Sequence, residues 1–159
     1  MVETIIADLK DGTHALDFMH VLSAYAEDPM GGGAPLSEYT KSNLVAALRK
    51  QINNFIVLCY VDGKIAGISN CFYGFSSFKA KPLVNIHDFA ILPQFRGQGL
   101  SKHLLDKVEI TAKEKDCCKI TLEVLENNLR AKKVYLAFGF VGYELNPEMG
   151  KAVFWQKSL

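Results

Sequence analysis

Residues 96–101 have the composition of an anion-binding turn. Gly97 and Gly99 are separated by one residue and stand directly before an amphipathic stretch that begins with Leu100. A glycine turn that opens a helix leaves the first backbone N–H groups without acceptors, with the positive end of the helix dipole behind them. Glycine also admits positive φ and lets a ligand approach the backbone closely, so such a turn favours phosphate. Arg96 adds a cation beside it.

The spacing excludes two common phosphate motifs. A P-loop requires Gly-Lys-Ser/Thr, but Gly99 is followed by Leu100 and Ser101. The dinucleotide fingerprint requires a third glycine where this chain has Lys102. The pattern that fits is Gln/Arg-x-x-Gly-x-Gly/Ala, which begins here at Gln94. Taken alone, this short pattern is also compatible with an ordinary glycine-rich turn between a strand and a helix.

Periodicity and turn signals predict the elements that must place this turn. Asp62-Gly63 is a hairpin signal, Ser37 a helix N-cap, and Gly139 a natural helix end. We predict strands over residues 4–9, 55–61, 64–75, 86–92, 119–124, 140–145 and 152–156, of which the last two form a hairpin. We predict helices over residues 15–25, 38–48, 100–112 and 128–138. Lys79, Lys81 and Pro82 are expected in a loop. This order predicts one α/β (α+β) domain over residues 1–159. Its single mixed, mostly antiparallel sheet would have about seven strands, with helices on both faces.

Composition limits the classes of function. The 159 residues carry a net charge of +1, so no broad field favours nucleic acid or an anionic membrane. No apolar run reaches transmembrane length, and we expect no targeting segment. The four cysteines lack the spacing of a disulfide scaffold or a zinc site, which predicts free thiols in the cytoplasm and no bound metal.

The segment over residues 122–140 contains a second motif, which supports the interpretation of the pattern that begins at Gln94. It resembles the second motif of the GNAT acyltransferase superfamily, Val-x-x-x-Asn-x-x-Ala-x-x-x-Tyr-x-x-x-Gly-Phe. The positions that match are Val124, Asn128, Ala131, Tyr135, Gly139 and Phe140. The glycine turn then resembles the acetyl-CoA pyrophosphate loop of that superfamily. The run His87-Asp88-Phe89 and the helix with Tyr135 look most like the diamine and thialysine acetyltransferases.

The resemblance implies how acetyl-CoA would bind. The pyrophosphate would lie on the backbone of residues 96–101, where the hydroxyl of Ser101 could also donate. The pantetheine arm would pair with the strand that carries Phe89 and Ile91, and the N–H of Phe89 or Ala90 would polarise the thioester carbonyl. Asn128 would hold the pantetheine or an ordered water. The implied coenzyme-binding residues are Phe89, Ala90, Ile91, Gln94, Arg96, Gly97, Gln98, Gly99, Leu100, Ser101, Asn128 and Tyr135.

The same resemblance implies the catalytic groups. Tyr135 would protonate the coenzyme A sulfur, although a tyrosine on an amphipathic helix is also typical of core packing. His87 is the best-placed base, because a free imidazole titrates near pH 6.5. The diamine-type enzymes carry Glu at this position, so His87 would act as the base, relay through water, or only line the pocket. Strand alternation predicts that Asp88 points to the opposite sheet face, where it has a structural role or is a partner at the helix layer.

The acceptor site is the least specific part of the sequence. Tyr25, Glu27 and Asp28 precede a glycine-rich loop and would receive a cationic amine together with His87, while Tyr73 and Phe75 would wall the pocket. Solvated carboxylates and core aromatic rings explain these residues equally well.

The resulting prediction is an acetyl-CoA-dependent N-acetyltransferase. It would transfer acetyl directly to a primary amine, without an acyl-enzyme, because no Cys occupies a motif position. The favoured acceptor is a small molecule such as a diamine, a polyamine or an amino-acid-like amine. A protein lysine or N-terminal amine, or a non-catalytic acyl-CoA sensor, are the alternatives. The resemblance also implies a homodimer through the C-terminal strands.

Overall fold

The computed structural model describes residues 1–143 and 146–159. Within it, the chain divides into two compact units, Met1–Leu122 and Glu123–Leu159. The first unit holds the sheet and the glycine turn of residues 96–101, and the second holds the helix that carries Tyr135. Each is described by itself.

The first unit is built on a sheet of five strands in sequential order. The strands are β1 (Val2–Ile6), β2 (Asn54–Val61), β3 (Lys64–Ser76), β4 (Lys81–Ile91) and β5 (Ile120–Leu122). The first four pair antiparallel, and β5 pairs parallel to β4 over a short register from Val84 to Ile86. The turn at Asp62-Gly63 has positive φ at both residues, which suits the twist of a two-residue hairpin.

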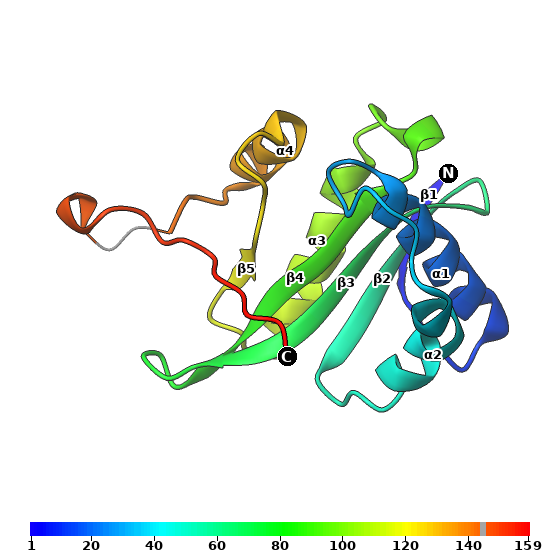
Figure 1. Ribbon diagram of the computed structural model, residues 1–159, viewed down its shortest axis with the longest axis horizontal. Coiled ribbons are helices and arrows are strands. Elements are labelled where there is room, and N and C mark those ends of the chain that lie inside the picture. Colours follow the sequence, from blue (N-terminus) through cyan, green and yellow to red (C-terminus); the bar gives the residue numbers. More distant parts are fainter. Residues whose placement is uncertain (144–145) are drawn as a thin grey trace. The chain divides into compact units, whose positions relative to one another are not determined.

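Helices cover both faces of this sheet, as predicted (Figure 1). One face packs against α1 (Gly12–Glu27) and α2 (Glu38–Leu48), and the other against α3 (Leu100–Glu114). The alternation of β2 places Ile56 and Leu58 in the α1 face. Val57 and Cys59, also fully buried, then point to the α3 face.

The second unit contains α4 (Leu129–Phe138) and a short 3-10 turn, η2 (Pro147–Met149). The side chain of Asn128 accepts from the Ala131 N–H at 3.2 Å and caps α4. Gly139 ends the helix with φ 103°, a conformation that glycine adopts without the penalty of a Cβ. Both ends of α4 therefore follow from local sequence.

The prediction of about seven strands was wrong. The described part of the chain has five, because residues 140–143 and 152–156 form no strand. Residues 144–145 of the expected hairpin lie outside the described residues. A run of β-forming side chains becomes a strand only when another backbone supplies the ladder, and no such partner lies beside these segments in the described second unit.

Other boundaries moved by a few residues. Strand β1 begins at Val2, because its ladder with β2 runs from Val2 opposite Val61. Strand β4 begins at Lys81, since Lys81 and Pro82 pair with the far end of β3. Helix α1 begins at Gly12, because the carboxylate of Asp11 accepts from two N–H groups of its first turn.

Candidate active site

The glycine turn forms the junction of β4 and α3. A single 3-10 turn, η1 (Pro93–Phe95), follows the strand, and Gly97 and Gly99 then adopt φ of 81° and 76°. A Cβ on either glycine would meet nothing within 4 Å. These glycines are therefore required by the backbone conformation, and the space beside them is open.

Helix α3 differs from the other α-helices in having no side-chain cap. Asp11, Ser37 and Asn128 cap α1, α2 and α4, whereas α3 has Gly99 at this position. The backbone N–H groups from Gly97 to Ser101 donate to no acceptor in the part of the chain that the structure describes. Uncapped N–H groups at the positive end of a helix dipole form an anion site.

Arg96 lies in this turn, but its guanidinium is directed elsewhere. Nη2 donates to Oδ2 of Asp28 at 2.8 Å, and Nε donates to the carbonyl of Ile91 at 3.0 Å. Asp28 follows the end of α1, and its Oδ1 also accepts from the Met30 N–H. The two residues therefore join the glycine turn to the start of the glycine-rich loop.

The outer edge of β4 is paired with β5 along only part of its length. Its ladder with β5 ends at Ile86, opposite Leu122. Further on, the Leu92 N–H donates to the Ala66 carbonyl of β3 at 2.8 Å. Since backbone groups alternate along a strand, the Ala90 N–H also points to β3, and the Phe89 N–H points to the outer edge. Of the two N–H groups proposed for the thioester carbonyl, the register therefore favours Phe89.

A β-bulge lies at the point where the β5 ladder ends. Asn70 pairs with Asp88 and Cys71 with Ile86, so His87 is an extra residue without a partner on β3. His87 meets the ring of Phe72 edge-on, with 5.7 Å between the ring centres, and Phe72 packs against the α1 core. Asp88 is also on the α1 face, because it pairs with Asn70, two residues along from the core residue Ile68.

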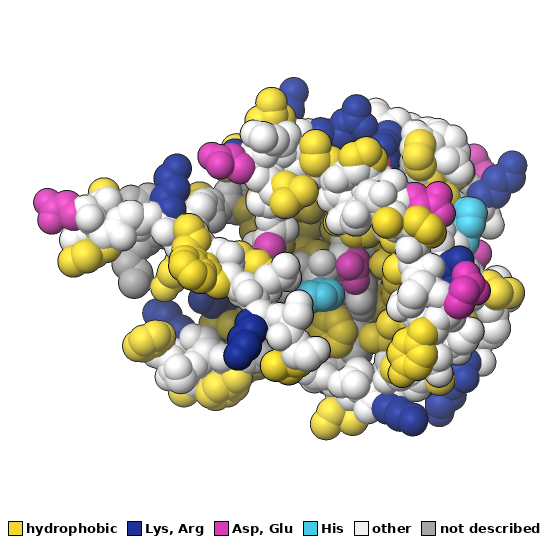
Figure 2. Space-filling model, viewed as in Figure 1, with side chains coloured by type: hydrophobic (Ala, Val, Ile, Leu, Met, Phe, Trp, Pro, Cys, Tyr) yellow, Lys and Arg dark blue, Asp and Glu magenta, His cyan; other side chains and the backbone are white. Residues whose placement is uncertain are grey.

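The expectation that Asp88 points away from His87 was therefore wrong. Alternation fails across a bulge, where two residues of one strand oppose one residue of the other. Both side chains lie on the α1 face. His87 is exposed and Asp88 is half-buried. In Figure 2 a histidine and an acidic side chain reach the surface over the sheet.

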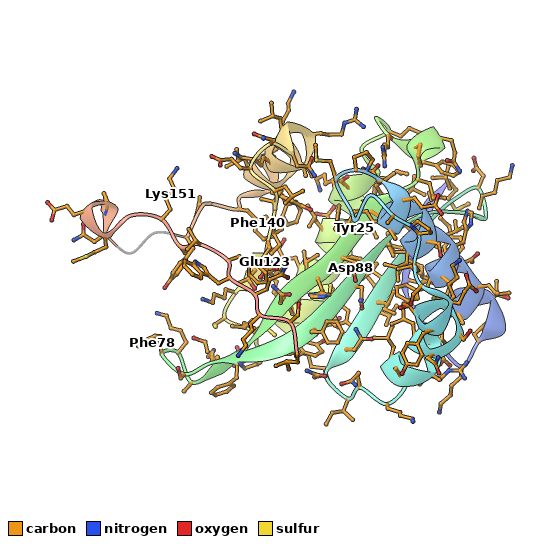
Figure 3. All side chains as sticks on the ribbon, in the orientation of Figure 1. Tyr25, Phe78, Asp88, Glu123, Phe140 and Lys151 are labelled. Carbon is orange, nitrogen blue, oxygen red and sulfur yellow. The ribbon has the colours of Figure 1, made fainter. Side chains whose placement is uncertain are left out.

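Tyr25 of α1 lies on the same face as Asp88 of β4 (Figure 3). Burial of the ring, and the negative charges of Asp88 and Asp28, raise the pKa of the Tyr25 hydroxyl above its ordinary value. The phenol therefore stays protonated at neutral pH beside two carboxylates. Asp28 is ion-paired with Arg96, while the Oδ2 of Asp88 accepts from the Asn70 side chain at 2.9 Å.

Of the remaining residues predicted for the acceptor site, the two aromatic residues lie on the other face of the sheet. Tyr73 lies two residues beyond Cys71 on the α3 face, with its ring centre 5.1 Å from that of Phe55. Phe75 is two residues further along the same strand face and is largely exposed. Glu27 ends α1 as an exposed carboxylate. The structure thus gathers Tyr25, His87 and Asp88, with Asp28 at the adjoining loop.

Tyr135 and Asn128 belong to the second unit. Tyr135 is buried on α4, its ring meets that of Phe140 at 5.7 Å between centres, and its carbonyl accepts from the Phe140 N–H. Asn128 holds the first turn of the same helix. The motif residues of this unit therefore have clear roles in its own folding.

Sequence reasoning missed two residues of the α1 face, Asn54 and Asn70. Both stand in strand segments otherwise dominated by apolar side chains. A buried amide in such a segment is a usable signal, because it must find hydrogen-bond partners. Among the residues that the structure describes, no group of His, Cys, Asp or Glu side chains could hold a metal ion. Nor does any helix in the described ranges have the length and apolar character needed to cross a membrane.

Comparisons with known proteins agree with this arrangement. A family model described as "Acetyltransferase (GNAT) family" matches residues 17–140. The thialysine N-epsilon-acetyltransferase of Bos taurus is 31% identical over 75 residues, which are 47% of this chain and 44% of that protein. The chain spans about half the length of the curated relatives it matches.

Two solved structures share the fold. A probable acetyltransferase is 22% identical, covers 98% of both chains and superposes with a TM-score of 0.81. An aminoglycoside N-acetyltransferase in complex with CoA is 17% identical, with 100% of this chain and 96% of that chain covered and a TM-score of 0.76. Because the family model matches most of the sequence, this chain belongs to the acetyltransferase (GNAT) family.

Proposed function

We propose that the protein is an N-acetyltransferase that moves acetyl from acetyl-CoA directly to the primary amine of a small molecule. The observation that carries this proposal is the uncapped start of α3. In a chain of this family, the N–H groups from Gly97 to Ser101 would donate to the diphosphate of coenzyme A. The family relation and the thialysine acetyltransferase relative support an amine as the acceptor.

The donor would lie between this turn and the outer edge of β4. The diphosphate would accept from the backbone N–H groups, with Gln94, Gln98 and Ser101 around it. The pantetheine arm would continue along Phe89 and Ile91, where the ladder with β5 has ended. Arg96 would contribute by fixing the turn, since its cation is already paired with Asp28.

The acceptor would bind over the α1 face. An alkylamine is protonated at neutral pH, so it favours a half-buried carboxylate such as Asp88. Tyr25 would border this position, and His87, exposed beside Asp88, would take the proton before attack. The bulge supports this division of roles because it brings His87 and Asp88 to one face.

In the transfer itself, the neutral amine attacks the thioester carbonyl. The N–C bond forms, the C–S bond breaks, and the Phe89 N–H would stabilise the oxyanion of the tetrahedral intermediate. Tyr135 would give its proton to the departing thiolate and regain one from solvent, to which the attacking nitrogen loses its second proton as the amide forms. Asn128 would hold an ordered water or the pantetheine. These roles for the second unit rest on the motif and on family membership.

A coenzyme A release assay tests the proposal. Acetyl-CoA is incubated with spermidine, putrescine, thialysine, an aminoglycoside and a lysine peptide, and the acetylated product is identified by mass spectrometry. We expect the highest kcat/KM with a small amine, and an Asp88→Asn variant should raise the KM for that amine. Preference for the peptide would indicate a protein acetyltransferase. Tight CoA binding without transfer to any amine would indicate a sensor.

Self-association would follow from the C-terminal segment. Val153, Phe154 and Trp155 each expose more than two thirds of their surface, so we include a homodimer through this segment in the proposal. Light scattering after size exclusion should give the mass of a dimer, and a chain with Phe154 and Trp155 changed to Ser should give that of a monomer.

A further inference from the structure

Asn70 is a buried amide in the middle of a β-strand. Its side chain lies on the α1 face of β3, and the residue is only 5% exposed. A buried amide is costly unless its donors and acceptor are satisfied. Here the Oδ1 of Asn70 accepts from Nδ2 of Asn54 at 2.7 Å, and its Nδ2 donates to Oδ2 of Asp88 at 2.9 Å. The three side chains form a relay that ends at the proposed acceptor site.

The direction of this relay is fixed by a backbone carbonyl. The carbonyl of Cys71 can only accept, and it receives a hydrogen bond from the Asn54 side chain at 2.9 Å. The Asn54 atom at this point must therefore be Nδ2, which also donates to Asn70. Asn70 must then present Oδ1 to Asn54 and Nδ2 to Asp88. Reversing either amide would place two donors or two acceptors face to face.

The relay determines what Asp88 offers to a ligand. An amide Nδ2 has no lone pair for a proton, so the carboxylate oxygen that faces Asn70 remains an acceptor. The hydrogen bond holds the carboxylate in one orientation without neutralising its charge. Asp28, the other carboxylate near Tyr25, is ion-paired with Arg96. No lysine or arginine of residues 1–143 or 146–159 forms an ion pair with Asp88.

We propose that Asn70, held in place by Asn54, is a positioning residue that orients the Asp88 carboxylate toward the ammonium group of the acceptor. This inference rests on the proposed function. It attributes the amine specificity of the proposed enzyme to a relay of neutral amides. A lysine or arginine at position 70 would cancel the charge that attracts the amine. An apolar residue would leave the half-buried carboxylate unsupported and free to rotate.

The kinetic test is a double-mutant cycle. Asn70→Leu, of similar size, should raise the KM for the best small amine at least tenfold and leave the KM for acetyl-CoA within twofold. In an Asp88→Asn background the same change should alter the amine KM less than twofold. An equal effect in both backgrounds, or an equal rise in the KM for acetyl-CoA, would show a merely structural role and overturn the inference.

Ser69→Ala is the matched control. Ser69 directly precedes Asn70 in β3 and is fully buried. Its side chain forms a hydrogen bond with the thiol of Cys71 on the α3 face. The substitution removes a buried polar group from the same strand, so it should reduce stability without moving the amine KM. A rise in the amine KM equal to that of Asn70→Leu would also overturn the inference. If Asn70→Leu does not fold, Asn54→Leu tests the relay from its more exposed end, with an expected rise of about threefold.

A second readout separates this inference from the proposed function. The side-chain amide signals of Asn70 in a ¹H–¹⁵N spectrum should shift on Asp88→Asn and on addition of spermidine to the unsubstituted protein. Signals that respond to neither would overturn the relay, whatever the enzyme turns over. Signals that respond to both, in a protein that acetylates no amine, would support the relay and refute the acetyltransferase proposal.

Discussion

Replacement of Ser101 by proline removes one backbone N–H from the proposed diphosphate site, together with the Ser101 hydroxyl. Ser101 is the second residue of α3, where the N–H has no acceptor within the helix and a proline ring is tolerated. Its N–H is one of the run from Gly97 to Ser101 that lacks an acceptor in the described chain. The substitution thus tests whether these N–H groups hold the coenzyme.

The expected loss can be worked from the chemistry of the contact. A hydrogen bond from an N–H to a charged oxygen contributes about 1.5–3 kcal/mol. Since about 1.4 kcal/mol corresponds to a tenfold change in Kd, Ser101→Pro should raise the Kd for coenzyme A by about 10- to 100-fold. Isothermal titration calorimetry with coenzyme A measures this without requiring turnover.

Two control variants isolate the N–H. Ser101→Ala removes only the hydroxyl and should have a smaller effect on the Kd. Tyr39→Pro makes the same change at the second position of α2, where the tyrosine is 78% exposed. It should match Ser101→Pro in urea unfolding and leave the Kd unchanged. If folded Ser101→Pro binds coenzyme A within twofold of the unsubstituted protein, the backbone of this turn does not hold the diphosphate.

Three further substitutions or conditions test other parts of the site and the core. Tyr135→Phe should lower kcat at least tenfold with the Kd for coenzyme A unchanged; an unaltered kcat would remove Tyr135 from the mechanism. His87→Ala should displace the acidic limb of the pH profile of kcat/KM, and a limb that stays in place would exclude His87 as the base. Burial raises the pKa of the Cys59 thiol to about 11 and that of the Cys71 thiol to about 12, from 9.0 in an exposed thiol. As the pH rises, these thiols lose their protons in the unfolded chain before they do so in the folded one. The free energy of unfolding should therefore be steady below pH 9 and fall as the pH rises toward 12. Urea titrations between pH 8 and 11 measure the slope, which should be shallower in Cys71→Ala; an identical slope would contradict the assignment to this thiol.

The parts of the fold that depend on local sequence preferences were predictable from the sequence. Gly97 and Gly99 indicated a left-handed turn before a helix, and both have positive φ. Gly139 ends α4, and Asp62-Gly63 makes the hairpin, as their types predicted. In each case the conformational preference of one or two residues decides the outcome, and no distant segment is involved.

The acceptor face was not predictable in the same way. Whether His87 and Asp88 share a face depends on the pairing of β3 with β4, and the bulge that joins them has no local signal in the run Ile86–Leu92. The pairing of Arg96 with Asp28 brings together residues that are 68 positions apart. This ion pair occupies the cation that was expected to bind phosphate and one of the carboxylates that were expected to bind the amine.

The sequence by itself determined the glycine turn before α3, the helix caps and the family, because these depend on residue types at fixed short spacings. Only the tertiary structure decided which charges remain open to a ligand. It pairs Asp28 with Arg96, turns Asp88 to the face of His87, and supports Asp88 through Asn70. The physical reason is that a carboxylate's role depends on the partner that faces it, and strand register and helix docking choose that partner.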